Sequence, residues 1–204
     1  TGTQHLQPYR MHIGGAWTDA ASGETFESFN PFTAEPWALI PRAGADDVDR
    51  AVEAAFEAGK PGSPWRTMTA TARGALLRKL GDALMEHADE LGRIETRDNG
   101  KLIAEMGVQC KYLTQWYHYY GGLADKIEGT VIPIDKPDTF NYTVWEPLGV
   151  VACIVPWNSP LLLLTWKLAP ALAAGNTVVV KPSSYTSAST LEFMKVVESV
   201  GFPP

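Results

Sequence analysis

The sequence predicts an α/β fold in which helices flank a parallel sheet. Two continuous apolar runs, at 149–155 and 177–181, are rich in β-branched residues, which predicts parallel strands that are buried on both faces. Each run is followed by a helical pattern, the first beginning at Ser159 and the second near Ser187. Because parallel strands need a covering crossover between them, the order strand, helix, strand, helix indicates a doubly wound parallel sheet. With 45% hydrophobic residues among 204, the chain can bury a core.

The first hundred residues divide into small strands and then helices. Before residue 41, short apolar pieces alternate with turn residues such as Gly14-Gly15 and Asn30-Pro31, a pattern typical of strands. Asp46 opens a predicted helix with apolar residues at helical spacing, and Gly59 ends it. From about Thr69, a second amphipathic pattern predicts one long helical region that ends near the turn signal at 98–100.

A third helix is expected from about Lys101 to Lys126. Aromatic side chains recur along it at helical spacing, and we interpret them as core or interface packing: Tyr112, Trp116, Tyr119 and Tyr120. After it, the runs 130–134 and 140–145 are rich in β-branched and aromatic residues, and they are separated by a turn sequence. This pattern predicts two extended strands.

For the helix that follows residue 155, we expect Ser159 as the N-cap, Pro160 in the first turn and Gly175 at the end.

Composition excludes several classes of partner. The formal charge of −6 leaves no basic surface for nucleic acid or an anionic membrane. The most apolar stretch, 148–174, contains Asn158, Lys167 and three prolines, so we do not expect it to span a membrane. Two cysteines far apart, Cys110 and Cys153, provide neither a disulfide framework nor a CxxC metal site. We therefore expect no metal and a cytoplasmic protein.

Polar side chains stand where the two apolar strands end. Ligands of open parallel sheets bind at the carboxyl ends of the strands, where helix N-termini expose free N–H groups. After the first strand comes Asn158, whose amide at a helix start could stabilise an oxyanion, although an ordinary turn or cap is the alternative reading. After the second strand come Lys181, Ser183 and Ser184; for a lone lysine, a solvated surface position is the alternative.

Taken together, the two strand ends resemble a known family. The segment IVPWNSPLLLLTWKLAPALAAGNTVVVKPSS at 154–184 is similar, in order and in spacing, to the signature stretch of the NAD(P)-dependent aldehyde dehydrogenase superfamily. The segments RDNGK at 97–101, YYGGLADKIEGTVIP at 119–133 and EPLGVV at 146–151 resemble it as well. The resemblance covers nearly the whole chain.

The resemblance implies a role for each matching residue. Asn158 would donate its amide to the oxyanion of a thiohemiacetal intermediate, and Lys167 would support the active site from the helix, unless it is a plain surface charge. Lys181 would reach the adenosine ribose, with Ser183 and Ser184 continuing that contact. The remaining residues implied to line the cofactor cleft are Ile154, Val155, Pro156 and Trp157.

The cofactor is NAD or NADP by this resemblance. The family pattern carries glutamate where this chain has Ser184. A glutamate would accept hydrogen bonds from the ribose of NAD and repel the 2′-phosphate of NADP. We therefore expect NADP to be accepted at least as well as NAD. The alternative is that Ser184 merely begins the turn before the next helix.

The resemblance also implies a domain organisation. It makes 1–126 the first part of a cofactor-binding domain, 127–148 a pair of protruding oligomerisation strands, and 149–204 the continuation of an incomplete Rossmann-like sheet. The catalytic domain, with the cysteine nucleophile and the glutamate base, would follow residue 204. Cys153 and Cys110 match neither place, so we expect the chain alone to be inactive and the complete protein to be a dimer or tetramer.

The expected reaction is oxidation of an aldehyde to its carboxylic acid with NAD(P)+, through a cysteine thiohemiacetal and thioester. One alternative is a branch of the same chemistry that passes the acyl group to coenzyme A. Another is a cofactor-binding or assembly fragment with no chemistry of its own.

Overall fold

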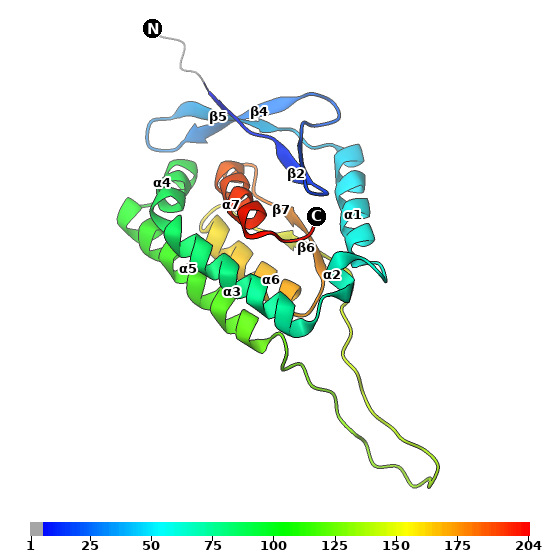
Figure 1. Cartoon of the computed structure of the whole chain (residues 1–204). Coiled ribbons are helices and arrows are strands. Elements are labelled where there is room, and N and C mark those ends of the chain that lie inside the picture. Colours follow the sequence, from blue (N-terminus) through cyan, green and yellow to red (C-terminus); the bar gives the residue numbers. More distant parts are fainter. Residues whose placement is uncertain (1–5) are drawn as a thin grey trace.

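The computed structural model describes residues 6–204, which form a compact body and one long arm (Figure 1). The body contains three separate small sheets and a layer of helices. The helices are α1 (Ala45–Gly59), α2 (Pro64–Thr67), α3 (Ala70–Glu86), α4 (Ala88–Asn99), α5 (Ile103–Leu123), α6 (Pro160–Ala173) and α7 (Ser187–Val200).

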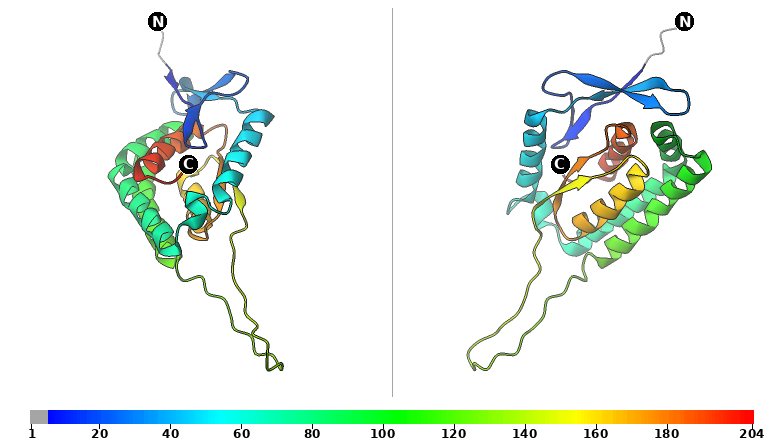
Figure 2. Two further views of the ribbon diagram at one scale, coloured as in Figure 1. Left: turned by 45° about the vertical axis from the view of Figure 1, so that its right-hand side comes forward. Right: turned by 180° about the vertical axis from the view of Figure 1, so that it is seen from behind.

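The predicted parallel strands are confirmed. They are β6 (Val150–Ile154) and β7 (Thr177–Lys181), which pair in parallel, with α6 as the crossover between them. Near the N-terminus, β1 (Gln7–Pro8) and β4 (Thr25–Asn30) flank β5 (Glu35–Pro41), and β2 (Met11–Ile13) pairs with β3 (Ala16–Thr18). The three-stranded sheet lies across one end of the body, over α4 and α7 (Figures 1 and 2).

The β6–β7 pair is buried on one face and partly open on the other. Cys153 and Val155 point into the main core, which α3, α5, α6 and α7 build around Tyr117 and Phe193. On the opposite face α1 touches both strands, yet Ile154 remains 64% exposed. We expected strands buried on both faces, and this is wrong for the second face.

The helix predicted from Asp46 is confirmed as α1, although its apolar residues Val48, Val52 and Phe56 are exposed.

The long helix expected from Thr69 is two helices. α3 ends and α4 begins at His87, whose φ of −95° and ψ of 3° are not helical. The amphipathic pattern continues across the break, because Leu84 and Leu91 on either side are both buried. Periodicity alone therefore could not locate the break.

α3 and α5 cross at two glycines. A Cβ added to Gly121 would lie 2.8 Å from the carbonyl oxygen of Gly74, and one added to Gly74 would lie 2.3 Å from that of Gly121. The two backbones therefore touch at this point, and a larger residue at either position would force them apart. Next along α5, a Cβ added to Gly122 would meet nothing within 4 Å outside the helix's own backbone.

Aromatic residues on α5 gather mainly at its surface. Tyr117, outside the predicted stripe, is the fully buried one, whereas Tyr112 and Tyr119 are 40% and 59% exposed. Trp116 is half-buried and packs edge-on against Trp166 of α6, with ring centroids 5.6 Å apart. Core packing was therefore wrong for Tyr112 and Tyr119, and interface packing remains a prediction.

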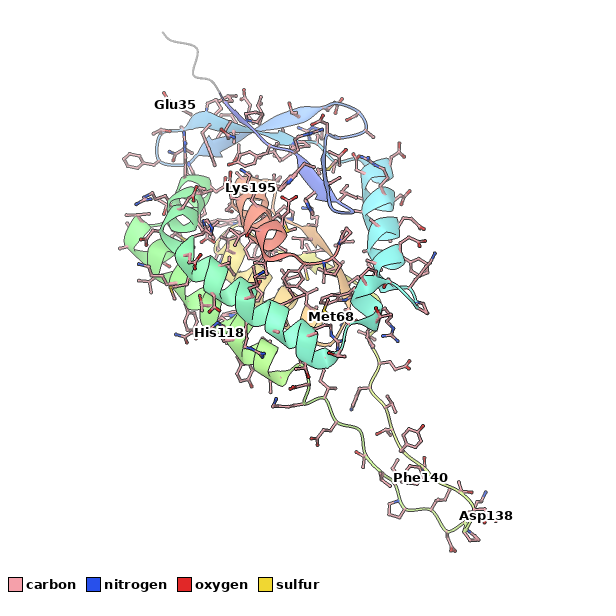
Figure 3. The ribbon with its side chains drawn as sticks, viewed as in Figure 1. Glu35, Met68, His118, Asp138, Phe140 and Lys195 are labelled. Atoms are coloured by element: carbon pink, nitrogen blue, oxygen red, sulfur yellow. The ribbon has the colours of Figure 1, made fainter. Side chains whose placement is uncertain are left out.

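The segment between α5 and β6 projects from the body as an extended arm (Figure 1). Its two sides are joined by one isolated antiparallel bridge between Val131 and Tyr142 and by a hydrogen bond from the Thr130 N–H to Thr143 Oγ1 over 2.8 Å. Asp138 and Phe140 lie toward the tip (Figure 3). We expected two regular strands here, and the structure has none. An isolated two-stranded ribbon is marginal in water, since no further strand or helix covers it. The arm exposes large apolar side chains: Val131, Ile132, Ile134, Phe140, Tyr142, Val144 and Trp145.

Candidate active site

The carboxyl ends of β6 and β7 lie side by side. Ile154 is paired with Lys181, and the Val155 N–H donates to the Lys181 carbonyl over 3.2 Å. The segments that leave the two strands, 156–159 and 182–186, therefore begin at the same edge of the sheet. The sequence-predicted residues thus form one neighbourhood, which α6 and α7 continue.

Asn158 lies in the turn between β6 and α6. Its side chain is exposed, and its amide has no hydrogen-bond partner among the described residues. Trp157 beside it is 53% exposed and Ile154 is 64% exposed, whereas Val155 turns its side chain into the core. The amide can thus donate to an anion that approaches this edge.

Ser159 is the N-cap of α6, as expected, but its side chain makes no capping bond. Its Oγ instead accepts a hydrogen bond from Lys101 Nζ over 3.3 Å, and the same ammonium lies 2.8 Å from Glu105. The expected role of Ser159 as a side-chain cap was therefore wrong. Pro160 follows in the first turn, as expected, and has no N–H to satisfy.

A buried glutamate from α4 takes over the capping of α6. Glu95 is 1% exposed, and its Oε1 accepts the Leu161 N–H over 3.0 Å. Its Oε2 accepts the Cys110 S–H over 3.3 Å. Burial, opposed by these two hydrogen bonds, raises the pKa of Glu95 to about 7. Burial, reinforced by the neighbouring carboxylate, raises the pKa of the Cys110 thiol far above its ordinary value.

Asp98, one turn further along α4, caps α7 in the same way. It is 1% exposed, accepts the Ser189 N–H over 2.8 Å and accepts the Ser28 hydroxyl over 3.2 Å. Burial is the main cause that raises its pKa to about 6. Two carboxyl groups of α4 therefore accept hydrogen bonds from the N-termini of α6 and α7, the helices that follow the two strand ends. Our sequence reasoning missed both acids, although each stands on the apolar face of α4 at helical spacing from Leu91.

The second strand end carries an exposed ammonium and a serine turn. Lys181 and Ser184 are exposed, and Ser183 is half-buried. Ser183 Oγ accepts the Tyr185 N–H over 3.3 Å, and its carbonyl accepts the Thr186 N–H over 3.1 Å. Ser184 is the first residue inside this turn, as the alternative reading expects, and its hydroxyl has no hydrogen-bond partner among the described residues. Its role toward a cofactor therefore stays a prediction.

Lys167 is exposed on α6. Its charge tends to lower the pKa of Cys153, but burial outweighs it, so the pKa of that thiol is raised. Cys110 and Cys153 are both free and buried, within the helix and the strand where the sequence placed them. A buried thiol with a raised pKa is a poor nucleophile, because attack requires the thiolate.

Two cavities in the described part of the chain lie away from the strand ends. One cavity of about 80 Å³ lies beside Trp37 and Arg97, and another of about 400 Å³ lies beside Trp17 and Lys195. Neither is lined by a residue of the strand-end site. Residues 6–204 hold no group of three or more His, Cys, Asp or Glu side chains placed to bind a metal. Each helix of this part of the chain is either too short or too polar to span a lipid bilayer.

Comparison with known proteins decides the family. The sequence profile described as "Aldehyde dehydrogenase family" matches residues 17–204. The chain belongs to the aldehyde dehydrogenase family. The expected resemblance and the α/β fold class are thereby confirmed.

Named relatives of the family align with almost the whole chain. A dehydrogenase of Acinetobacter baylyi, named for (Z)-2-((N-methylformamido)methylene)-5-hydroxybutyrolactone, is 49% identical over 97% of the chain and 40% of its own length. Aldehyde dehydrogenase 1A1 of Homo sapiens is 42% identical over 98% of the chain and 40% of its own length. The chain therefore spans about 40% of the length of these relatives.

Solved structures of the family superpose closely. An aldehyde dehydrogenase variant from Bacillus cereus aligns with a TM-score of 0.92 and 41% identity, over 97% of this chain and 40% of its own. A betaine aldehyde dehydrogenase variant from Staphylococcus aureus, in complex with NAD+, aligns with a TM-score of 0.89 and 39% identity, over 95% of this chain and 39% of its own. An NADP-dependent enzyme of E. coli aligns with a TM-score of 0.92 and 35% identity, over 97% of this chain and 40% of its own. Members of the family use a nicotinamide cofactor and act on aldehydes.

Proposed function

We propose that this chain is part of an enzyme that oxidises an aldehyde to its carboxylic acid with NAD(P)+, to which it contributes the oxyanion donor and part of the cofactor site. The observation that carries the proposal is the exposed Asn158 amide, at the edge of the sheet where Lys181 also leaves its strand. The nucleophilic cysteine and the glutamate base are proposed to lie outside residues 1–204. The buried state of Cys110 and Cys153 supports this assignment.

In the proposed reaction, a cysteine thiolate forms a C–S bond to the aldehyde carbon, and the carbonyl π electrons move onto oxygen. Asn158 donates its amide N–H to the resulting oxyanion. Such a donor acts mainly in the transition state, since the negative charge exists only there and in the intermediate. When bound, the nicotinamide would accept the hydride from that carbon, so that the C=O bond re-forms and leaves a thioester. Water would then add to the thioester carbon, and cleavage of the C–S bond would release the acid and restore the cysteine thiol. Lys167 is proposed to support this site from α6.

The residues at the β7 end fit a nucleotide cofactor. The exposed Lys181 ammonium and Ser184 hydroxyl can donate to ribose oxygens, and Trp157 and Ile154 offer apolar surface at the neighbouring strand end. With no carboxylate at Ser184, nothing at that position repels a 2′-phosphate, so we propose that NADP is used at least as well as NAD. Ser183 and the backbone from Val155 to Pro156 complete the proposed cleft.

The arm is proposed to mediate self-association into a dimer or tetramer. Its exposed apolar side chains and its unpaired backbone groups would be covered by a second subunit. We also propose a cytoplasmic location, because two free thiols fit a reducing compartment.

The direct test is an assay of a protein that extends to the relatives' full length. We expect aldehyde-dependent formation of NADH or NADPH and release of the free acid, without any need for coenzyme A. Residues 1–204 alone serve as the control and should show no turnover. Turnover by the control, formation of an acyl-coenzyme A, or no oxidation of any aldehyde tried would each contradict the proposal.

A further inference from the structure

We propose that Glu95 is a positioning residue for Asn158: its buried carboxylate caps the N-terminus of α6 and thereby fixes the turn that carries the amide. The inference rests on the proposed function, in which Asn158 is the oxyanion donor. It concerns a contact between segments far apart in sequence, since Glu95 and Leu161 are separated by 66 positions.

The N-terminus of α6 needs an acceptor from elsewhere in the chain. The first N–H groups of a helix have no partner inside it. Pro160 lacks an N–H, and the Ser159 side chain makes no capping bond. The Leu161 N–H is therefore the first helical donor, and Leu161 is fully buried away from water. Glu95 accepts from that N–H, three residues beyond Asn158.

Glu95 is itself held firmly. Its side chain is 1% exposed, and its second oxygen accepts the Cys110 S–H of α5. Lys101, in the loop after α4, donates a hydrogen bond to the Ser159 hydroxyl, so it holds the same turn at the residue after Asn158. On its α6 side the turn is thus held by Glu95 of α4 and by Lys101 of the loop after α4, and on its other side it continues from β6. Asn158 stands between these anchors with its amide exposed.

Such anchoring matters for an oxyanion donor. Electrostatic stabilisation is effective only where the donor already points at the position that the oxyanion will occupy. A displacement of the order of 1 Å at a reacting group can lower the rate by about 10²-fold. Loss of the cap would leave the Leu161 N–H buried without a partner, and the helix end would have to shift or admit water.

The test is a set of variants made in the full-length protein. Glu95→Leu keeps the bulk and removes the acceptor, whereas Glu95→Gln keeps an amide oxygen that can accept from Leu161. Cys110→Ala is the matched control, because it removes the other partner of Glu95 and leaves the capping bond. We expect kcat to fall about tenfold in Glu95→Leu and less than about threefold in the other two. The dissociation constant of the cofactor should change less than about twofold in all three.

A double-mutant cycle with Asn158→Ala separates positioning from general structural damage. If Glu95 acts through Asn158, adding Glu95→Leu to Asn158→Ala should lower kcat by less than about twofold more. An equal loss in both backgrounds, or an unchanged kcat in Glu95→Leu, would overturn the inference. If Glu95→Leu does not fold, Glu95→Asp replaces it, since the shorter carboxylate no longer reaches Leu161 without a shift.

Hydrogen exchange gives a readout that does not depend on activity. We expect the amide of Leu161 to exchange faster in Glu95→Leu than in wild type, and at the wild-type rate in Cys110→Ala. Unchanged exchange would overturn the role of Glu95 even in an active enzyme. Conversely, if the wild type is inactive but Leu161 exchanges faster in Glu95→Leu, the proposed function is rejected while the capping role of Glu95 is supported.

Discussion

Replacing Glu95 by Gln should change how the stability of the protein depends on pH. The carboxyl group is buried, and its pKa rises from an ordinary value of 4.5 to about 7 because burial disfavours the charged form. The groups that face it are Asp98, which raises this pKa, Lys101, which lowers it, and the Cys110 thiol, which donates a hydrogen bond. Glutamine has nearly the same shape, keeps an acceptor for the Leu161 N–H and cannot ionise.

The sign follows from proton binding. Between pH 4.5 and about 7, the folded state binds more protons at Glu95 than the unfolded state does, so wild type loses stability as the pH rises through this window. A rise of the pKa from 4.5 to about 7 corresponds to about 3 kcal/mol of unfolding free energy in total. Most of it lies between about pH 5 and pH 8, and Glu95→Gln should be free of this loss.

The assay is thermal or urea unfolding of both proteins at several pH values across this window. We expect Glu95→Gln to gain about 2–3 kcal/mol relative to wild type as the pH rises from about 5 to about 8. Glu86→Gln makes the same chemical change at an exposed residue of α3 that has no ion pair among the described residues, and it should follow wild type. Parallel curves for Glu95→Gln and wild type would refute the burial argument.

Three further outcomes are expected of the full-length protein. Ser184→Glu should lower kcat/KM for NADP about tenfold relative to NAD, through repulsion of the 2′-phosphate; an unchanged ratio in steady-state kinetics would remove Ser184 from the cofactor site. Gly121→Ala should lower the free energy of unfolding by about 1–3 kcal/mol, since its Cβ would lie 2.8 Å from the Gly74 carbonyl oxygen. Gly122→Ala, whose Cβ would meet nothing within 4 Å, should leave the free energy of unfolding unchanged or raise it by up to about 1 kcal/mol. Equal melting temperatures of these two variants would argue against the close crossing. Deleting 134–140 from the arm should reduce the assembly size measured by light scattering, and an unchanged size would contradict its role in self-association.

Local sequence patterns located most of the fold. β6 and β7 could be predicted because their β-branched runs are bounded by Gly149 and Gly175. α7 could be predicted because a glycine, Gly201, follows its last residue, and in the structure this glycine has the left-handed conformation that ends many helices. The break at His87 could not, because the apolar stripe runs through it. The openness of the second face of β6 and β7 could not either, since periodicity does not tell which face a neighbouring element covers.

The candidate site divides in the same way. That Asn158 and Lys181 lie at one edge could be expected, because carboxyl ends of adjacent parallel strands meet there. The caps made by Glu95 and Asp98 could not, because each joins α4 to a helix about 66 or 91 positions away. The available signal was weak: two acids on the apolar face of a helix, which in a folded protein must find partners.

Asn158 in the full-length protein provides the most direct test of the central claim. Turnover of an aldehyde with NAD+ or NADP+ should be compared between wild type and Asn158→Ala, together with cofactor binding to both. We expect kcat to fall about 10²–10³-fold while the dissociation constant of the cofactor changes less than about twofold, because an oxyanion donor acts mainly in the transition state. Unchanged turnover in Asn158→Ala, or a loss explained by weaker cofactor binding, would contradict the account.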